Sequence, residues 1–151
     1  MTSIAIEAPN QPAVVQLIDE LDAYQKPLYP AESHHGIDMS ALMQSNVIFA
    51  VARDDAGHAV GCGAIVIGPN YGELKRMFVS PRARGTGVGK ALLEFLEQAA
   101  IEKDCLVATL ETGIYQPEAL GLYERAGYVR CEPFGDYQPD PMSVFMRKTL
   151  R

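Results

Sequence analysis

The chain has 151 residues, of which 48% are hydrophobic and 21% charged, a composition typical of a globular protein with one domain. Its formal net charge of −6 at pH 7 argues against a general nucleic-acid binder, because such proteins hold the phosphate backbone with clustered Lys and Arg. No apolar stretch approaches the roughly 20 residues that span a bilayer, and the N-terminus does not resemble a signal peptide, so we expect no membrane segment.

Three cysteines, Cys62, Cys105 and Cys131, lack the spacing of metal ligands. An odd number of cysteines without such spacing predicts free thiols in a reducing compartment. We therefore expect a cytoplasmic protein without a metal site.

The N-terminal half predicts a short strand, a helix, a loop and three further strands. Alternation indicates a strand over residues 3–7, and Asn10 as N-cap with Pro12 in the first turn opens a helix. A loop over residues 29–37 and a short helix over 38–44 follow. We expect strands at 47–53, 60–67 and 71–79, with a hairpin turn over residues 54–57 between the first two.

The strand over residues 71–79 contains a change of phase. Leu74, Met77 and Val79 are its expected core residues, but strict alternation places Leu74 and Met77 on opposite faces. One extra residue near Lys75–Arg76 restores the phase, so we predict a β-bulge there, which would splay this strand from its neighbour.

The C-terminal half predicts a helix from Val88, whose apolar side chains recur at helical spacing. The nearly continuous apolar run 106–110 favours a strand buried on both faces in a parallel arrangement. A second helix is expected over residues 117–126, with Gly127 as a left-handed cap. Strands at 128–131 and 143–148, joined by a loop rich in Pro and Asp, complete the chain.

The turn between Val79 and the helix from Val88 is the most informative segment. It carries Arg82 and Arg84 and then glycines at three alternate positions, Gly85, Gly87 and Gly89. A helix N-terminus has unpaired N–H groups and a positive dipole end, and glycines let phosphates approach the backbone closely. The segment therefore predicts a pyrophosphate site.

Two better-known phosphate motifs do not fit this segment. A Walker A loop needs Ser or Thr after Gly-Lys and an earlier Gly, whereas Ala91 and Arg84 occupy those positions. The Rossmann fingerprint needs Gly where Lys90 stands, and the hairpin-rich N-terminal half does not match a dinucleotide fold.

The element order, together with this turn, resembles the GNAT superfamily of acyl-CoA-dependent N-acetyltransferases. The family signature of Arg or Gln, two residues, Gly, one residue, and Gly or Ala falls on Arg84, Gly87 and Gly89. The segments Glu-Leu-Lys-Arg-Met-Phe-Val-Ser-Pro before it and Ala-Leu-Gly-Leu-Tyr-Glu-Arg-Ala-Gly-Tyr after it also match. The resemblance implies an α/β fold in one domain over residues 1–151. Its sheet would be mixed and mostly antiparallel, with a splayed strand pair and flanking helices.

The resemblance also implies where acetyl-CoA binds as co-substrate. The pyrophosphate would be held by the backbone amides of one continuous segment, namely Arg84, Gly85, Thr86, Gly87, Val88, Gly89 and Lys90. The splayed strand end, Met77, Phe78 and Val79, would pair with the pantetheine arm as an added strand does. Gln116 stands where the family often has Asn, and its amide could still reach the same arm.

For catalysis, the resemblance assigns Tyr123 as the acid that protonates the departing thiolate. A thioester is already activated, but an alkyl amine is only about one part in a thousand neutral at pH 7, so a base helps to produce the nucleophile. Glu73 is the first candidate base, through a water, and Glu111 is the second. A backbone N–H near Met77 or Phe78 is expected to hold the oxyanion.

Four residues are expected at the acceptor site. Arg76 beside the bulge can bind a carboxylate, and Glu111 ends the apolar strand. His35, with its neighbour His34, lies in a loop that walls the acceptor pocket in this family. Tyr137 belongs to the loop over residues 132–141, which is either a wall of that pocket or only a hairpin connection.

These observations predict transfer of an acetyl group from acetyl-CoA to a primary amine of a small, amino-acid-like acceptor, with neither nucleic acid nor membrane as partner. A protein or peptide acceptor is the alternative within the family. Outside it, the alternatives are a regulatory module that binds acyl-CoA with little catalysis, and a nucleotide-binding fold. A homodimer is an expectation from the family alone.

Overall fold

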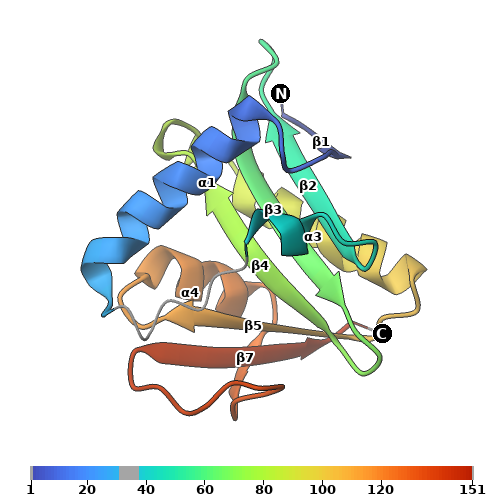
Figure 1. The fold of residues 1–151 in the computed structure, drawn as a ribbon, viewed down its shortest axis with the longest axis vertical. Coiled ribbons are helices and arrows are strands. Elements are labelled where there is room, and N and C mark those ends of the chain that lie inside the picture. The colour runs from blue at the N-terminus through green and yellow to red at the C-terminus, as the bar shows by residue number, and fades with distance from the viewer. Residues whose placement is uncertain (1, 31–37, 151) are drawn as a thin grey trace.

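In the computed structural model, which describes residues 2–30 and 38–150, a seven-stranded sheet forms the centre of the protein in the order β1-β2-β3-β4-β5-β7-β6 (Figure 1). Among the strands of the described residues, only β4 and β5 pair in parallel. The strands are β1 (Ser3–Ile6), β2 (Val47–Arg53), β3 (Ala59–Ile67), β4 (Gly72–Val79), β5 (Val107–Gly113), β6 (Val129–Cys131) and β7 (Ser143–Thr149). The α-helices are α1 (Pro12–Gln25), α2 (Met39–Leu42), α3 (Val88–Glu102) and α4 (Pro117–Arg125), and the short 3₁₀ helices are η1 (Lys26–Leu28) and η3 (Pro81–Ala83). This is the mixed, mostly antiparallel sheet that the family resemblance implies.

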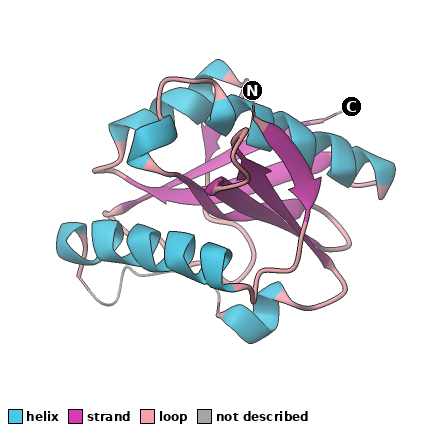
Figure 2. Ribbon diagram, turned by 90° about the horizontal axis from the view of Figure 1, so that it is seen from above, coloured by secondary structure: helices cyan, strands magenta, loops and turns pink. Residues whose placement is uncertain are grey.

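Helices cover both faces of the sheet, which gives three layers (Figure 2). Leu92 and Leu96 of α3 and Tyr123 of α4 pack into one apolar core. Val14 and Leu17 of α1 pack into a second core on the opposite face. The predicted inward positions of α1, Val14, Leu17, Ile18 and Leu21, are all buried.

The predicted β-bulge is present in β4. Cys62 of β3 pairs with Phe78 and Ala64 pairs with Lys75, so that two residues of β4, Arg76 and Met77, face the single residue Gly63. Arg76 has a φ of 54°, in the left-handed region that few residues other than glycine adopt. Leu74, Met77 and Val79 consequently pack into the same core, as their sequence pattern predicts.

Beyond Leu74, where the bulge follows, β4 and β5 separate. Their parallel pairing comprises only Gly72 with Ala108, Glu73 with Thr109 and Leu74 with Leu110. From there β5 continues along β7 as far as Gly113, while β4 continues along β3 as far as Val79. We call the resulting space between residues 75–79 and residues 111–113 the split.

The predicted N-cap of the first helix is wrong. Gln11, with φ −99° and ψ 150°, is the N-cap of α1 in place of Asn10, and Pro12 is the first helical residue. A proline restricts the residue before it to the extended region, which is also the conformation of an N-cap residue. The residue before Pro12 therefore becomes the N-cap of the helix. The left-handed cap at Gly127, with φ 100°, follows α4 as predicted.

Within residues 2–30 and 38–150, no helix combines the length and the apolar character needed to cross a bilayer.

A bidentate ion pair anchors the first strand and helix to β2. Arg53 Nε donates to Glu7 Oε2 at 3.0 Å and Nη2 donates to Oε1 at 2.8 Å, while Gln11 Nε2 also donates to Glu7. The hydrogen bonds from Arg53 lower the pKa of Glu7 below its usual value of 4.5. A carboxylate whose pKa falls on folding contributes stability above its unfolded pKa, and this contribution disappears as the pH falls through the folded pKa.

We therefore expect Glu7→Gln to lower the free energy of unfolding by about 1 kcal/mol at pH 7, a small value because the pair is partly exposed. Urea unfolding at a series of pH values should show this difference from the wild type shrinking below pH 4.5. The control is Glu102→Gln, which removes an exposed carboxylate at the end of α3. If the difference in unfolding free energy between Glu7→Gln and the wild type stays constant down to pH 3, the stabilising role given to the Glu7–Arg53 ion pair is wrong.

Candidate active site

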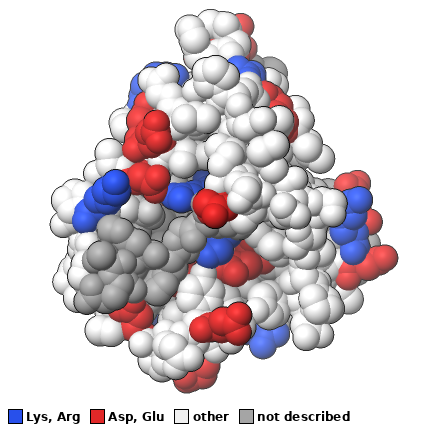
Figure 3. Space-filling view, viewed as in Figure 1, with Lys and Arg blue, Asp and Glu red and all other residues white. Residues whose placement is uncertain are grey.

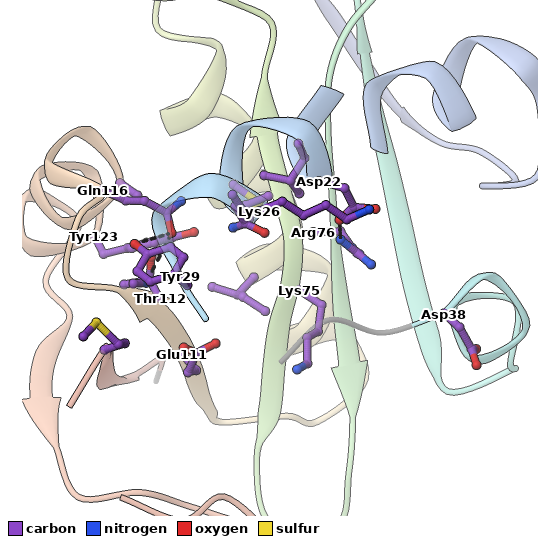
Figure 4. Close-up of a pocket in the computed structure, with 17 residues that line it drawn as sticks. Asp22, Lys26, Tyr29, Asp38, Lys75, Arg76, Glu111, Thr112, Gln116 and Tyr123 are labelled. Carbon is purple, nitrogen blue, oxygen red and sulfur yellow. Dashed lines mark hydrogen bonds and ion pairs between the residues drawn. The ribbon is translucent and has the colours of Figure 1, made fainter. Parts of the chain in front are cut away.

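A cavity of about 400 Å³ occupies the split and is lined from both faces of the sheet (Figure 4). On the side of α3 and α4 its lining consists of core residues, Leu74, Met77, Ala119 and Tyr123. On the side of α1 its lining is mostly charged, namely Asp22, Lys26, Lys75, Arg76 and Glu111. The cavity is thus bounded by residues from both faces of the sheet.

The glycine-rich turn lies at the end of β4, where α3 begins. Gly85 and Gly87 have φ values of 79° and 86°, and Gly87 is the N-cap of α3. The backbone N–H of Arg84 donates to Pro81 O, and that of Ala91 donates to Gly87 O. Within the described parts of the chain, the backbone N–H groups of residues 85–90 donate no hydrogen bond. They form a group of backbone donors at a helix N-terminus, which suits an anion.

The turn packs directly against α4. A Cβ atom added at Gly89 would lie 3.4 Å from Leu122 Cδ2 and 3.6 Å from Val79 Cγ2. Leu122 precedes Tyr123, so the turn packs against the same helix that carries the tyrosine of the cavity. The Arg84 side chain turns back over β4, where its Nε donates to Val79 O at 3.2 Å.

The edge of β4 that faces the split offers backbone donors. Residues 78 and 79 pair with β3 along their other edge, and Ser80 N–H donates to Val60 O at 2.8 Å. Because N–H groups alternate between the two edges of a strand, those of Val79 and Met77 point toward the split. No strand among the described residues pairs with this edge. An extended ligand arm can therefore bind there by adding to the sheet.

Tyr123 is buried at 6% exposure, and its ring packs against Tyr128 with ring centroids 5.8 Å apart. Burial, and to a smaller extent the charge of Glu111, raise the pKa of Tyr123 above its usual value of 10.0. Its hydroxyl makes no hydrogen bond to any residue that the structure describes, and Tyr123 lines the cavity. The group therefore remains protonated at neutral pH and is placed to donate into the cavity.

Gln116 is held in one orientation at the start of α4. Its Oε1 accepts from Gly113 N–H at 3.3 Å and from the Tyr29 hydroxyl at 3.2 Å. Both bonds use the amide oxygen, so the amide nitrogen is the group left to donate to a ligand in the cavity. Tyr29 fits here because Gly113 has no side chain, since a Cβ atom there would lie 1.8 Å from the Tyr29 hydroxyl.

Glu73 and Tyr137 lie beside the cavity and are not among the described residues that line it. The Tyr137 hydroxyl donates to Glu73 Oε2 at 2.6 Å, and Lys75 Nζ lies 3.0 Å from the same oxygen. Burial and then the hydrogen bond to Glu73 raise the pKa of Tyr137 above its usual value. Phe134 and Phe145 pack on Tyr137, so the loop over residues 132–141 is fixed against the sheet behind Lys75.

Glu111 and Arg76 do line the cavity. Glu111 is the first residue of β5 beyond the last pair with β4, and its Oε2 accepts from Ser143 Oγ at 2.7 Å. Arg76 Nη1 forms an ion pair with Asp22 of α1. His35, like His34, lies outside the described residues.

Several residues of the cavity were not singled out as site residues from the sequence. They are Asp22, Lys26, Tyr29, Asp38, Lys75, Thr112 and Met142. The sequence contained a signal that could have identified Lys75 as a site residue, because a β-bulge after it turns two successive side chains to one face of the strand. No sequence signal could have identified Tyr29, since its position depends on a contact with Gly113, which is far away in the sequence.

Charges of both signs meet at this site. Figure 3 shows acidic and basic side chains next to one another at the centre of the face that carries α1 and α2. Such a mixed surface favours a small polar ligand over an extended polyanion, which requires a large surface of one sign.

Comparisons with known proteins agree with this geometry. Residues 14–128 match the Acetyltransferase (GNAT) family. The chain is 50% identical over 150 residues to the IAA acetyltransferase of Azospirillum brasilense, covering 98% of this chain and 97% of that protein. It is 35% identical to the N-acetyltransferase YsnE of Bacillus subtilis over 141 residues, covering 91% and 92% of the two chains.

A solved structure extends the agreement to the whole fold. The crystal structure of a Klebsiella pneumoniae protein assigned as an acyl-CoA N-acyltransferase superposes with a TM-score of 0.90 at 43% identity, covering 100% of this chain and 99% of that one. The chain therefore belongs to the GNAT family of acetyltransferases, enzymes that take the acetyl group from acetyl-CoA.

Proposed function

We propose that this acetyltransferase, acting as a single domain, transfers the acetyl group to the primary amine of a small molecule by direct attack in a ternary complex. The observation that carries the proposal is the cavity in the split, which is lined from both faces of the sheet. The thioester enters from the side of α3 and α4, and the amine enters from the charged side under α1. The two reactants then meet between the strands without a covalent acyl-enzyme.

In this proposal, the turn and the strand edge hold the cofactor. The N–H groups of residues 85–90 bind the pyrophosphate, and those of Met77 and Val79 bind the pantetheine arm. The amide nitrogen of Gln116 donates to the same arm. Support comes from the geometry, since the edge of β4 that carries the N–H groups of Met77 and Val79 is not paired with β3, the turn with its unbonded N–H groups follows that strand, and Gln116 Oε1 is already bonded to Gly113 N–H.

The amine must lose a proton before it attacks, because at neutral pH nearly all of it is protonated. Two carboxylates are candidates, Glu111 directly from the cavity wall and Glu73 through a water. As the C–N bond forms and the C–S bond breaks, Tyr123 donates its proton to the sulfur. A backbone N–H of β4 near Met77 stabilises the oxyanion of the tetrahedral intermediate.

A cavity of about 400 Å³ must hold both the end of the thioester arm and the acceptor. Since ligand pockets commonly measure about 300–1,000 Å³, this volume supports a small acceptor. The name of the 50% identical relative, an IAA acetyltransferase, is compatible with this reading.

Tyr123→Phe is the test of catalysis. Loss of the proton donor should lower kcat by about 10²-fold while the KM for acetyl-CoA stays within twofold, because the phenyl ring keeps its packing. The measurement is steady-state thiol release with an acceptor amine. Tyr115→Phe is the control, since Tyr115 is 50% exposed and contacts Tyr29 through its ring and its backbone N–H, both of which phenylalanine keeps. Unchanged turnover in Tyr123→Phe would favour an acyl-CoA-binding module with little catalysis.

Gly87→Ala tests the pyrophosphate site against a matched glycine. Gly87 and Gly57 have φ values of 86° and 85°, and a Cβ atom at either position meets nothing within 4 Å. Alanine at each position should therefore cost a similar stability, about 1 kcal/mol, through backbone strain alone. Only Gly87→Ala should raise the Kd for coenzyme A, by about tenfold, because the strain reorients the N–H groups of the turn.

Thermal unfolding compares the stabilities and isothermal titration calorimetry compares the affinities. If Gly87→Ala and Gly57→Ala bind coenzyme A with equal affinity, the turn is not part of the binding site.

A further inference from the structure

We propose that the acceptor is an amino acid or a similarly small zwitterion that binds across the split. Its carboxylate contacts Lys75 and Arg76 on β4, and its amine faces Glu111 on β5. The inference rests on the proposed acetylation of a small amine and adds the chemical class of the acceptor and the residues that select it.

The β-bulge produces the cationic wall. Side chains of a regular strand alternate between faces, so successive residues rarely line one pocket. Here the extra residue in β4 brings Lys75 and Arg76 to the same side, and both line the cavity. Two adjacent cations, one of them a planar guanidinium, suit a carboxylate, which can accept hydrogen bonds from both.

Both cations are held in place before any acceptor binds. Lys75 contacts Glu73 Oε2 at 3.0 Å and the Tyr137 hydroxyl, and Arg76 pairs with Asp22. Their side chains are only 15% and 13% exposed. Partners of this kind reduce the cost of burying a charge and limit the rotamers that the side chains can adopt. Toward the acceptor carboxylate Glu73 acts through Lys75, which it positions, because it contacts Lys75 and is not among the described residues that line the cavity.

Glu111 forms the opposite, acidic wall. The last pair between the strands is Leu74 with Leu110, so Lys75 and Glu111 are the next residues on each side as the strands separate. Figure 4 shows these two side chains on opposite sides of the space between β4 and β5, and both line the cavity. The Ser143 hydroxyl fixes the Glu111 carboxylate with a hydrogen bond of 2.7 Å.

This arrangement also places the amine on the side where reaction occurs. Glu111 lies close enough to Tyr123 for its charge to affect the tyrosine pKa, so an amine at Glu111 lies near the proposed proton donor. A polyamine would instead place a second ammonium group against Lys75 and Arg76, where like charges repel. Opposite walls of opposite charge therefore select a molecule that carries both charges.

The test compares each acceptor with its neutralised analogue. Rates of thiol release from acetyl-CoA are measured with a panel of the common amino acids, each beside its α-carboxamide, and with putrescine. We expect at least one amino acid to be acetylated, with kcat/KM about 30-fold or more above that of its amide. The acid-to-amide ratio does not depend on the fraction of enzyme that is folded, so it is a safe readout for variants.

Two variants then separate the two walls. The double variant Glu73→Gln with Lys75→Gln removes the lysine together with its carboxylate partner, so that no unpaired charge is left buried. Its acid-to-amide ratio of kcat/KM should fall about tenfold. Glu111→Gln should lower kcat/KM by about tenfold or more for acid and amide alike, leaving the ratio within twofold of the wild type. Lys103→Gln, an exposed position after α3, is the control for loss of a positive charge.

Each outcome decides the proposal. It is overturned if amides are acetylated as well as acids, if putrescine is the best acceptor, or if the double variant keeps the wild-type ratio. In those cases amine acetylation itself still stands. If no member of the panel releases thiol although coenzyme A binds, both the zwitterion site and the small-amine function are wrong.

Discussion

The cavity that we propose as the active site depends on the separation of β4 from β5 after Leu74. Up to that residue the two strands share backbone hydrogen bonds, and beyond it each follows another partner, β3 or β7. An unpaired strand edge within a sheet is normally a liability, because its polar groups seek partners. Here the edge faces a cavity, where the extended arm of a thioester can satisfy those groups.

The bulge at Arg76 and Met77 has consequences on both faces of the sheet. On one face it restores Met77 and Val79 to the core under α3. On the other it brings Lys75 and Arg76 together beneath α1, with Glu73 and Asp22 as their partners. A single irregularity therefore maintains the packing on the side where we place the cofactor and concentrates charge on the side where we place the acceptor. The left-handed backbone of Arg76 is a strained conformation that persists because the surrounding sheet defines it.

Contacts across the split connect the two sides. Tyr29, just after η1, bonds Gln116 at the start of α4, and Gly113 leaves the space that this contact requires. The segment that ends the acceptor-side helix is thereby coupled to the residue we place on the pantetheine arm. Glu111 is likewise shared, since it lines the cavity on the side where we place the acceptor and its charge contributes to the raised pKa of Tyr123.

The sequence by itself determined the element order, the bulge in β4, the glycine turn and the Gly127 cap. Each of these depends on periodicity or on φ preferences within a few residues, so short segments carry the information. The tertiary structure alone decided that Tyr29 meets Gly113, that Arg76 pairs with Asp22, that Glu73 lies behind the cavity wall and that Lys75 lies across from Glu111. Such contacts join residues distant in the chain, and their geometry follows from how helices and strands pack together, which no local pattern encodes.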